Sequence, residues 1–484
     1  MRLSRRLFRP SRLTVAAAAG TGLVAALAAA WAAAPADDEK TGGETTVYAT
    51  GRNAFSFPAA NLGDEERTRF VIGNSFFKRN WVQAPASTKA RDGLGPHFIA
   101  RSCAACHMQD GRGAPPDFKK GLSEPPVALL MRLSIPGTDS VGGPLTEPVY
   151  GDQFQNFAVR GVTSEGQISL RYEPVAGRFA DGTRYTLQRP VYAFSKLNYG
   201  PMVKGTMTSP RIAPQVIGVG LLEAISESEI LRNASDQVAA GGPVRGMANR
   251  VFDVPSQQML VGRFGWKANV ATLAHQTAAA FIGDIGITSS VFPEETCTPR
   301  QVDCKKAPRG AEGRGHEIDD KTLADVVFYQ ATVAPPARRN PNDAQVRVGQ
   351  ALFAQAQCTA CHRPTYTTAG AMFPPLTPRV TSPALFGQTI HPYTDLLLHD
   401  MGEGLADGRP DFLANGRQWR TPPLWGIGLI PDVNGHQRLL HDGRARGVME
   451  AILWHDGEAR QSRDAVLQFN AAERAALVKF VESL

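Results

Sequence analysis

The sequence predicts a mainly α-helical protein in which two compact modules flank an inserted α+β region. Three observations support this fold class. The motif Cys-x-x-Cys-His occurs twice, at residues 103–107 and 358–362. Each copy follows a segment whose apolar residues recur at helical spacing, whereas the chain between the copies contains stretches that alternate as strands do. The 47 glycines and 35 prolines predict long loops between these elements.

The chain begins with a segment typical of a secretory signal peptide. Residues 1–12 carry five arginines and no acidic residue, and residues 13–34 form an alanine-rich run that ends in small residues. We expect cleavage near Ala34 and export to the periplasm. An uncleaved membrane anchor is the alternative, because the apolar run is long for a signal peptide. The stretch SRRLFR also resembles a twin-arginine signal, although we favour export of the unfolded chain.

The first module is expected within residues 35–130. Phe70, Gly73, Phe76 and Phe77 fall on one face of a predicted helix, and a glycine-containing loop connects that helix to the first motif. This order suggests that the helix packs beside the motif, as in a cytochrome c module.

Two cysteines at this spacing also occur in redox disulfides and in zinc sites. The histidine directly after the second cysteine, present in both copies, is instead typical of c-type haem attachment. Thioether bonds from Cys103 and Cys106 would fix the porphyrin, and His107 would then bind the iron. The same roles fall to Cys358, Cys361 and His362 in the second copy, so the sequence predicts two covalently bound haems.

An inserted α+β region is expected over residues 131–335. QISLRYEPV and TRYTLQRPVYAF alternate as strands do and are separated by a turn signal, and VGLLEAISESEILRNA has a helical pattern. Cys297 and Cys304 lie in a short loop, where a local disulfide is expected in an oxidising compartment.

The last module is expected over residues 336–484. Val346, Leu352 and Phe353 form the inward face of a helix that ends at the second motif. Asn470 and Glu473 form a capping-box start for a final helix. That helix buries a stripe made of Leu477, Phe480, Val481 and Leu484.

Charge gives no indication of a nucleic-acid partner. The net charge of +7 falls to +2 when the five arginines of the signal are removed. Haem propionates would lower it further, so the mature protein lacks the strong basic excess of nucleic-acid-binding domains.

Several longer segments resemble known dihaem enzymes. YTDLLLHDMG, WRTPPLWGIGL and LLHDGRARGVMEAILWHDGEA are similar to the C-terminal domain of bacterial dihaem cytochrome c peroxidases and of MauG-type enzymes. Across the mature chain, GLGPHFIARSCAACHMQDGRG, APQVIGVGLLEAI and VGRFGWKANVATLAHQTAAAFIGDIGITS resemble the dihaem oxidoreductase family, which is described as peroxidase-like or thiol oxidoreductase-like. The resemblance implies two haem modules and a peroxidase-like oxidoreductase. A thiol reaction is disfavoured, because the cysteines that it would need are taken by haem.

The resemblance also implies an axial ligand for the second haem. In such peroxidases, the residue fourteen positions after the histidine of a His-Asp-Gly-like turn binds the second iron, and counting from His441 gives His455. A histidine there would make this haem bis-histidine and lower its potential relative to histidine–methionine ligation. Met401 is the rival ligand, whereas Met449 is expected to pack in the core.

No comparable partner can be counted for the first haem. A peroxidase needs one iron with an open face and an acid/base group near it. Glu223 is the leading candidate for that group, since a lone acid among apolar residues is costly unless it is paired or functional. A structural, ion-paired carboxylate is the alternative, and His275 and Gln276 are weaker candidates. Trp266 is expected either to relay electrons or to pack as a simple aromatic.

Three functional classes follow from these features. The first is an enzyme that passes electrons from a low-potential haem to a reactive haem, which reduces peroxide or a related oxidant. The second is a pure electron-transfer cytochrome, and the third is a MauG-like enzyme that oxidises a partner protein. The large insertion favours an enzyme over a simple carrier. The expected partners of the protein are a peroxide-like substrate and a small redox donor protein or a quinol-linked chain.

Overall fold

A computed structural model describes residues 38–116, 128–311 and 315–484. The expected signal peptide at residues 1–34 lies outside the described residues, so export stays a prediction. Residues 38–484 form one compact unit. Among the residues that the structure describes, no helix has both the length and the apolar character needed to cross a membrane.

The fold is a mixture of helices and strands, with 30% of the residues in helices and 19% in strands. The expectation of a mainly α protein is therefore too narrow. Pairs of short strands form within segments that the sequence indicates only as loops, and one hairpin is longer than expected. The division into modules at residues 35–130, 131–335 and 336–484 stays a prediction.

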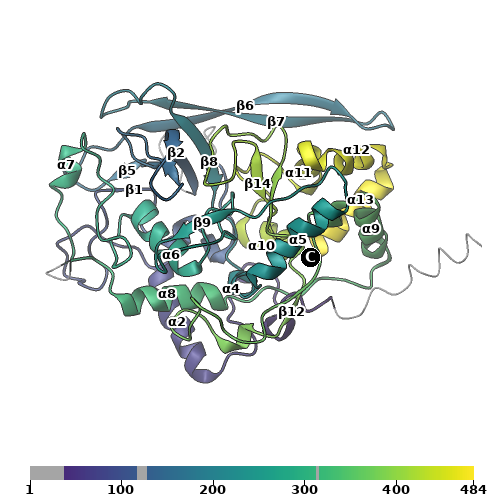
Figure 1. Cartoon of the computed structure of the whole chain (residues 1–484), viewed down its shortest axis with the longest axis horizontal. Coiled ribbons are helices and arrows are strands. Elements are labelled where there is room, and N and C mark those ends of the chain that lie inside the picture. Colours follow the sequence, from purple (N-terminus) through teal and green to yellow (C-terminus); the bar gives the residue numbers. More distant parts are fainter. Residues whose placement is uncertain (1–37, 117–127, 312–314) are drawn as a thin grey trace, which may run out of the picture. The chain divides into compact units, whose positions relative to one another are not determined.

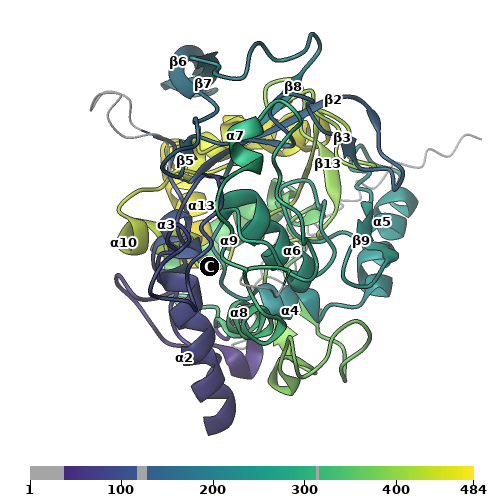
Figure 2. The same ribbon diagram turned by 90° about the vertical axis from the view of Figure 1, so that its left-hand side faces the viewer.

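Helix α2 (Asp64–Lys78) packs against helix α8 (Asp320–Thr332), as both views of the ribbon show (Figures 1 and 2). The rings of Phe70 and Phe77 contact Tyr329, with centroids 4.7 and 5.2 Å apart. Gly73 permits this approach, because a Cβ atom there would lie 2.1 Å from the carbonyl oxygen of Asp325. The predicted apolar face is confirmed for Phe70, Gly73 and Phe77.

A second helix pair holds the C-terminal motif. α9 (Ala344–Gln355) packs against α13 (Ala471–Ser483), and Phe353 contacts Phe480 with ring centroids 5.2 Å apart. The capping box of Asn470 and Glu473 is present, which confirms the predicted start of α13. The second motif follows α9 directly, in the 3₁₀ turn Cys358–Ala360.

The longest strands of the central region form two separate structures. β2 (Leu129–Thr138) pairs with β8 (Met207–Ile212) and with the short strands β3 (Pro144–Leu145) and β4 (Gln153–Phe154). β6 (Gln167–Arg178) and β7 (Arg184–Ser195) form a long antiparallel ribbon, labelled at the top of Figure 1.

The tip of the ribbon reaches the C-terminal helices. The amide of Ala180 donates to the carbonyl of Leu467 in α12 (Arg460–Gln468), and the Arg474 guanidinium of α13 lies 2.9 Å from Asp181. The ribbon thus contacts the C-terminal helices that follow the second motif in the chain.

The stretch VGLLEAISESEILRNA is two helices rather than one, because the Ser226 side chain caps a new start. The disulfide between Cys297 and Cys304 is present, with Cα atoms 5.8 Å apart, as predicted. The other helices are α3 (Cys103–Cys106), α4 (Val219–Glu223), α5 (Glu227–Ala239), α6 (Leu273–Ala280), α7 (Val302–Lys305), α10 (Ile430–Asn434) and α11 (Val448–Leu453). The other strand pairs are β1 (His97–Phe98) with β5 (Phe157–Ala158), β9 (Arg250–Asp253) with β10 (Gln258–Val261), β11 (Tyr366–Thr367) with β12 (Thr389–Ile390), and β13 (Leu398–Asp400) with β14 (Gln418–Arg420).

Candidate functional site

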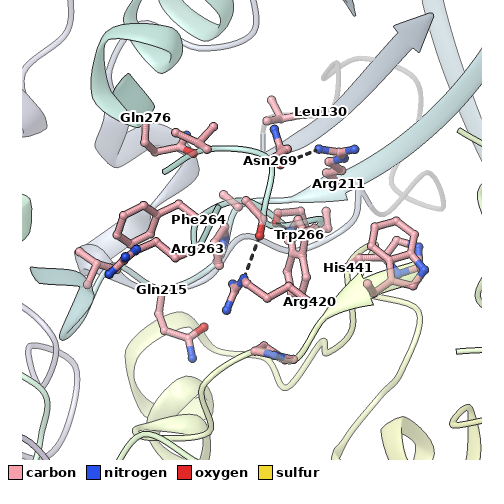
Figure 3. Close-up of a pocket in the computed structure, with 18 of the residues that line it drawn as sticks. Leu130, Arg211, Gln215, Arg263, Phe264, Trp266, Asn269, Gln276, Arg420 and His441 are labelled. Carbon is pink, nitrogen blue, oxygen red and sulfur yellow. Dashed lines mark hydrogen bonds between the residues drawn. The ribbon is translucent and has the colours of Figure 1, made fainter. Parts of the chain in front are cut away.

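One cavity of about 810 Å³ reaches both motifs. Its walls include the cysteines and histidines at residues 103–107 and 358–362. Figure 3 shows a part of it in which Trp266 and Arg420 lie between Arg263 on one side and His441 on the other. The volume is near the upper end of the roughly 300–1,000 Å³ usual for ligand sites, which suits a large group.

His107 is held by a backbone carbonyl from a distant segment. It follows the last residue of α3, and its Nδ1 atom lies 2.6 Å from the carbonyl oxygen of Pro214. A carbonyl only accepts hydrogen bonds, so Nδ1 carries the proton and Nε2 keeps the lone pair that a metal needs. Burial lowers the pKa of His107, which favours the neutral form that binds metals.

His362 is held in the same way. Its Nδ1 atom lies 2.9 Å from the carbonyl oxygen of Tyr393. Tyr393 adopts a left-handed backbone conformation with φ of 54°, which is uncommon for an aromatic residue. Burial, with a smaller contribution from the neighbouring His455, lowers the pKa of His362 to about 4. The second motif therefore has a neutral imidazole with another histidine nearby.

The Nδ1 atom of His455 also faces a backbone carbonyl oxygen, although His455 lies outside both motifs. It lies just beyond the end of α11 rather than within it, and Nδ1 lies 2.7 Å from the carbonyl oxygen of Ala451. Its side chain lines the same cavity as His362, and burial lowers its pKa. The rival Met401 also lines the cavity, whereas Met449 packs against the hydrophobic core.

The four motif cysteines are free thiols. Burial raises the pKa of Cys106 and of Cys358 to about 12, and it raises the pKa of Cys103 and Cys361 as well. Reactive and redox cysteines need the opposite, a lowered pKa and an accessible thiolate. These thiols therefore suit attachment chemistry better than thiol–disulfide exchange.

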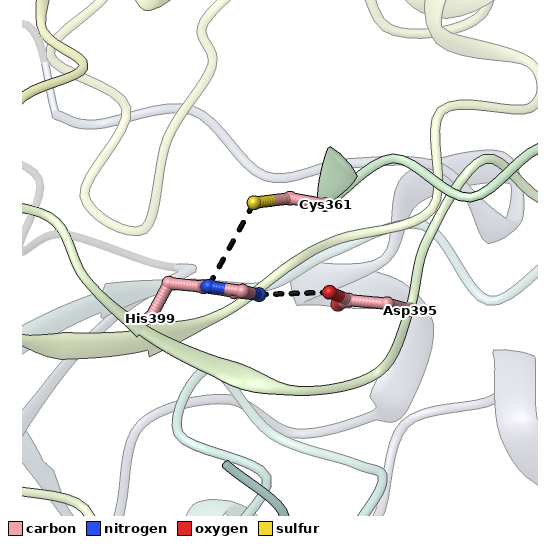
Figure 4. Close-up of side chains that lie close together, drawn as sticks. All are labelled: Cys361, Asp395 and His399. Atoms are coloured by element: carbon pink, nitrogen blue, oxygen red, sulfur yellow. Dashed lines mark hydrogen bonds and ion pairs between the residues drawn. The ribbon is translucent and has the colours of Figure 1, made fainter. Parts of the chain in front are cut away.

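A cluster beside the second motif joins Cys361, Asp395 and His399 (Figure 4). Nε2 of His399 lies 2.8 Å from Asp395, while Nδ1 lies 2.7 Å from Glu458 and 3.7 Å from the sulfur of Cys361. Burial alone would lower the pKa of His399, but the carboxylate of Asp395 raises it well above its ordinary range. Both ring nitrogens face carboxylates, so neither is left for a metal. Sequence reasoning overlooked this histidine.

Glu223 is buried at the end of α4, and its Oε1 atom accepts a 2.7 Å hydrogen bond from the amide of Leu273. Oε2 has no hydrogen-bond partner among the described residues. Burial raises the pKa of Glu223 to about 7. Glu223 is not one of the residues that line the cavity; Leu222 and Leu273 line it instead.

Two other candidates from the sequence, His275 and Gln276, do lie on the cavity wall. The nearest acidic partner of His275 is Asp253, 3.5 Å from Nδ1. Trp266 also lines the cavity, and its indole nitrogen donates to the carbonyl of Ile212.

Three buried arginines on the cavity wall hydrogen-bond to backbone carbonyls. Arg112 binds the carbonyls of Arg438 and Leu440, Arg263 binds carbonyls around the end of α4, and Arg420 binds those of Gly265 and Thr421. Within the described part of the chain, none of them has a carboxylate at ion-pair distance. Carboxylates beyond ion-pair distance offset the cost of burying these charges only in part, namely Asp442 for Arg112, Glu223 for Arg263 and Asp395 for Arg420. An anionic group in the cavity would therefore stabilise all three arginines. The sequence alone gives no signal for this, because burial of an arginine depends on tertiary contacts.

These features fit two c-type haems. Each motif offers a pair of free thiols and a neutral histidine whose Nε2 atom is the nitrogen left for iron. The arginine-lined cavity between them suits the negative charge of haem propionates.

Comparisons with known proteins give one match. The family model described as "Di-haem oxidoreductase, putative peroxidase" matches residues 36–484. No curated protein and no solved structure is significantly similar to the chain.

Proposed function

The chain belongs to the di-haem oxidoreductase family, and we propose that it is an exported, peroxidase-like enzyme with two c-type haems. In this proposal each haem forms one module, with the α+β region between them. One haem has low potential and receives electrons, and the other reduces peroxide or a related oxidant. The disulfide between Cys297 and Cys304 supports an oxidising compartment such as the periplasm.

A difference between the two motifs carries the proposal. His455 lines the same cavity as His362 and, like His399, lowers its pKa, but both nitrogens of His399 face carboxylates. No second histidine among the described residues contributes to the lowered pKa of His107. We assign His455 as the second axial ligand at the second motif. The iron bound by His107 would then keep an open face for the oxidant.

Bound haem would supply an iron that takes up peroxide and exchanges single electrons. The chain holds the proximal rings through the carbonyls of Pro214 and Tyr393, which keeps each Nε2 atom in its metal-binding form. The three carbonyl-bound arginines would neutralise the propionates.

Reduction of hydrogen peroxide to two water molecules consumes two electrons and two protons. A small redox protein or a quinol-linked chain would deliver the electrons. Glu223, with its pKa near 7, is our candidate for holding and releasing a proton at Oε2. Because Glu223 does not line the cavity, neighbouring side chains would have to admit the oxidant or a water molecule to reach it. Gln276 and His275 on the wall are the alternatives.

The test is peroxide turnover by the half-reduced protein, in which only the higher-potential haem is ferrous. We expect consumption of hydrogen peroxide in the presence of an electron donor. Glu223→Gln keeps the size of the side chain and its acceptor for the Leu273 amide, and should lower turnover by about a hundredfold without loss of haem. The matched variant Gln276→Ala should retain most of the activity.

Two results would change the proposal. Unchanged turnover in Glu223→Gln would remove Glu223 from proton transfer, and a loss in Gln276→Ala would then show that the Gln276 amide orients the oxidant through hydrogen bonds. Absence of any peroxide consumption, with both irons six-coordinate in every redox state, would favour a pure electron-transfer cytochrome.

A further inference from the structure

His399 lies where two segments that follow the second motif in the chain meet. It belongs to β13 and is 1% exposed. Asp395 comes from the loop whose Tyr393 carbonyl holds His362. Glu458 comes from the turn that follows His455 by three residues. One buried ring therefore connects the segment that supports the proximal histidine with the segment that carries the assigned distal one.

Both carboxylates that contact His399 are held in place by further hydrogen bonds. Asp395 accepts hydrogen bonds from the amide of Leu397 and from the side chain of Gln237, and Glu458 accepts them from the amides of Asp400 and Arg245. Since carboxylates accept, each bond to His399 needs a ring N–H, and the imidazole must carry both protons. The bridge is thus a buried cation between two anions, which is stable only when all three partners are in place.

Backbone conformation shows that the loop needs such support. Tyr393 and Leu396 both have positive φ, at 54° and 60°. Left-handed conformations of bulky residues persist only where surrounding contacts enforce them. The bonds of Asp395 to His399, Gln237 and Leu397 supply such contacts between these two residues.

A glycine fixes the position of the ring. A Cβ atom on Gly246 would lie 2.4 Å from Cε1 of His399, so the backbone of Gly246 packs directly against the imidazole. The amide of Gly246 also donates to Gln237, which holds Asp395 from the same side.

We propose that His399 is a positioning residue for the second haem. Its imidazolium, hydrogen-bonded at both ring nitrogens, connects the loop that orients His362 with the turn that follows His455. This rests on the proposed function, since it assumes that both histidines bind the same iron. His399 itself does not touch the metal, because both of its nitrogens are bound to carboxylates.

The experiment compares haem-loaded wild type with His399→Gln, by low-temperature electron paramagnetic resonance and by redox titration. Glutamine cannot donate to both carboxylates in the geometry of the ring. We expect a shifted or broadened low-spin signal and a changed reduction potential of that haem. We also expect added imidazole to bind more tightly than in wild type, because it would compete with a less firmly held His455. His97→Gln is the matched control, since His97 is also buried near a carboxylate but does not line the cavity.

Glu458→Gln is a second variant that keeps the bond between His399 and Asp395, and Gly246→Ala is a third that presses on the ring. Both variants should shift the low-spin signal of the second haem in the direction expected for His399→Gln. They therefore test the proposal even if His399→Gln does not accumulate. If wild type shows a bis-histidine signal that none of these variants alters, the positioning role is overturned while the proposed function stands. A wild-type protein with no bis-histidine haem would overturn the proposed ligation itself.

Discussion

His107 and His362 each turn Nδ1 to a backbone carbonyl, yet the two motifs have different surroundings. Beside the first motif, the buried Asp110 accepts hydrogen bonds from two neutral hydroxyl groups, those of Ser56 and Tyr329. Beside the second, a charged histidine bridges two carboxylates, and His455 lies next to His362. Identical pentapeptide patterns thus prepare the same kind of histidine ligand, and the tertiary structure decides which other side chains lie near each histidine.

The largest expected effect comes from removing the attachment points of one haem only. Cys358→Ala or Cys361→Ala should leave one covalent haem of the two, because the first motif lies on other elements and has its own supports. The pyridine haemochrome measures haem per chain, and haem staining of a denaturing gel shows that the attachment is covalent. Removing Cys297 and Cys304 together is the control and should leave both haems. A colourless protein that contains zinc would contradict this prediction.

Removing the second axial ligand should make the two motifs more alike. We expect His455→Ala to convert the low-spin signal of the second haem to high spin, or to a new low-spin form if another side chain replaces it, and to shift its potential. Met401→Ala is the matched variant, because Met401 lines the same cavity. An unchanged spectrum in His455→Ala, together with a disturbed one in Met401→Ala, would assign the ligand to Met401.

A smaller effect tests the buried acid near the cavity. Burial raises the pKa of Glu223 from its ordinary value of 4.5 to about 7, so the folded protein binds this proton more tightly than the unfolded chain does. Between about pH 5 and 7 the folded state retains a proton that the unfolded chain has released, so stability falls as the pH rises through this window. The loss amounts to about 3 kcal/mol when Glu223 is fully ionised.

Glu223→Gln should abolish this part of the pH dependence. Denaturant unfolding of haem-loaded wild type and variant at about pH 5 and about pH 8 measures it. We expect the variant to gain stability relative to wild type at the higher pH. A difference in unfolding free energy that is the same at both pH values would show that the pKa of Glu223 is not raised.

The sequence predicts local features well. The capping box at Asn470 and Glu473 and the disulfide loop depend on residues close together in the chain, and the structure confirms both. The ribbon of β6 and β7 follows from alternation and a turn, which are also local signals. The sequence predicts too small a share of strand, because strand pairs as short as β1 with β5 leave no periodic pattern to recognise.

The groups that distinguish the two motifs come from distant parts of the chain. Pro214 is 107 positions from His107, and Glu458 is 59 positions from His399. Neither contact has a pattern in the sequence, because each depends on how helices and loops pack. The same reason applies to Glu223. Its isolation among apolar residues predicts burial, but not that its neighbour Leu222 would line the cavity while Glu223 would not.

The central claim is that the two irons differ in ligation, with His455 closing one and the other left open. Low-temperature electron paramagnetic resonance of the fully oxidised wild-type protein tests it most directly. We predict one high-spin ferric signal from the haem bound by His107 and one low-spin, bis-histidine signal from the haem bound by His362. Two low-spin signals, unaffected by partial reduction, would contradict the account.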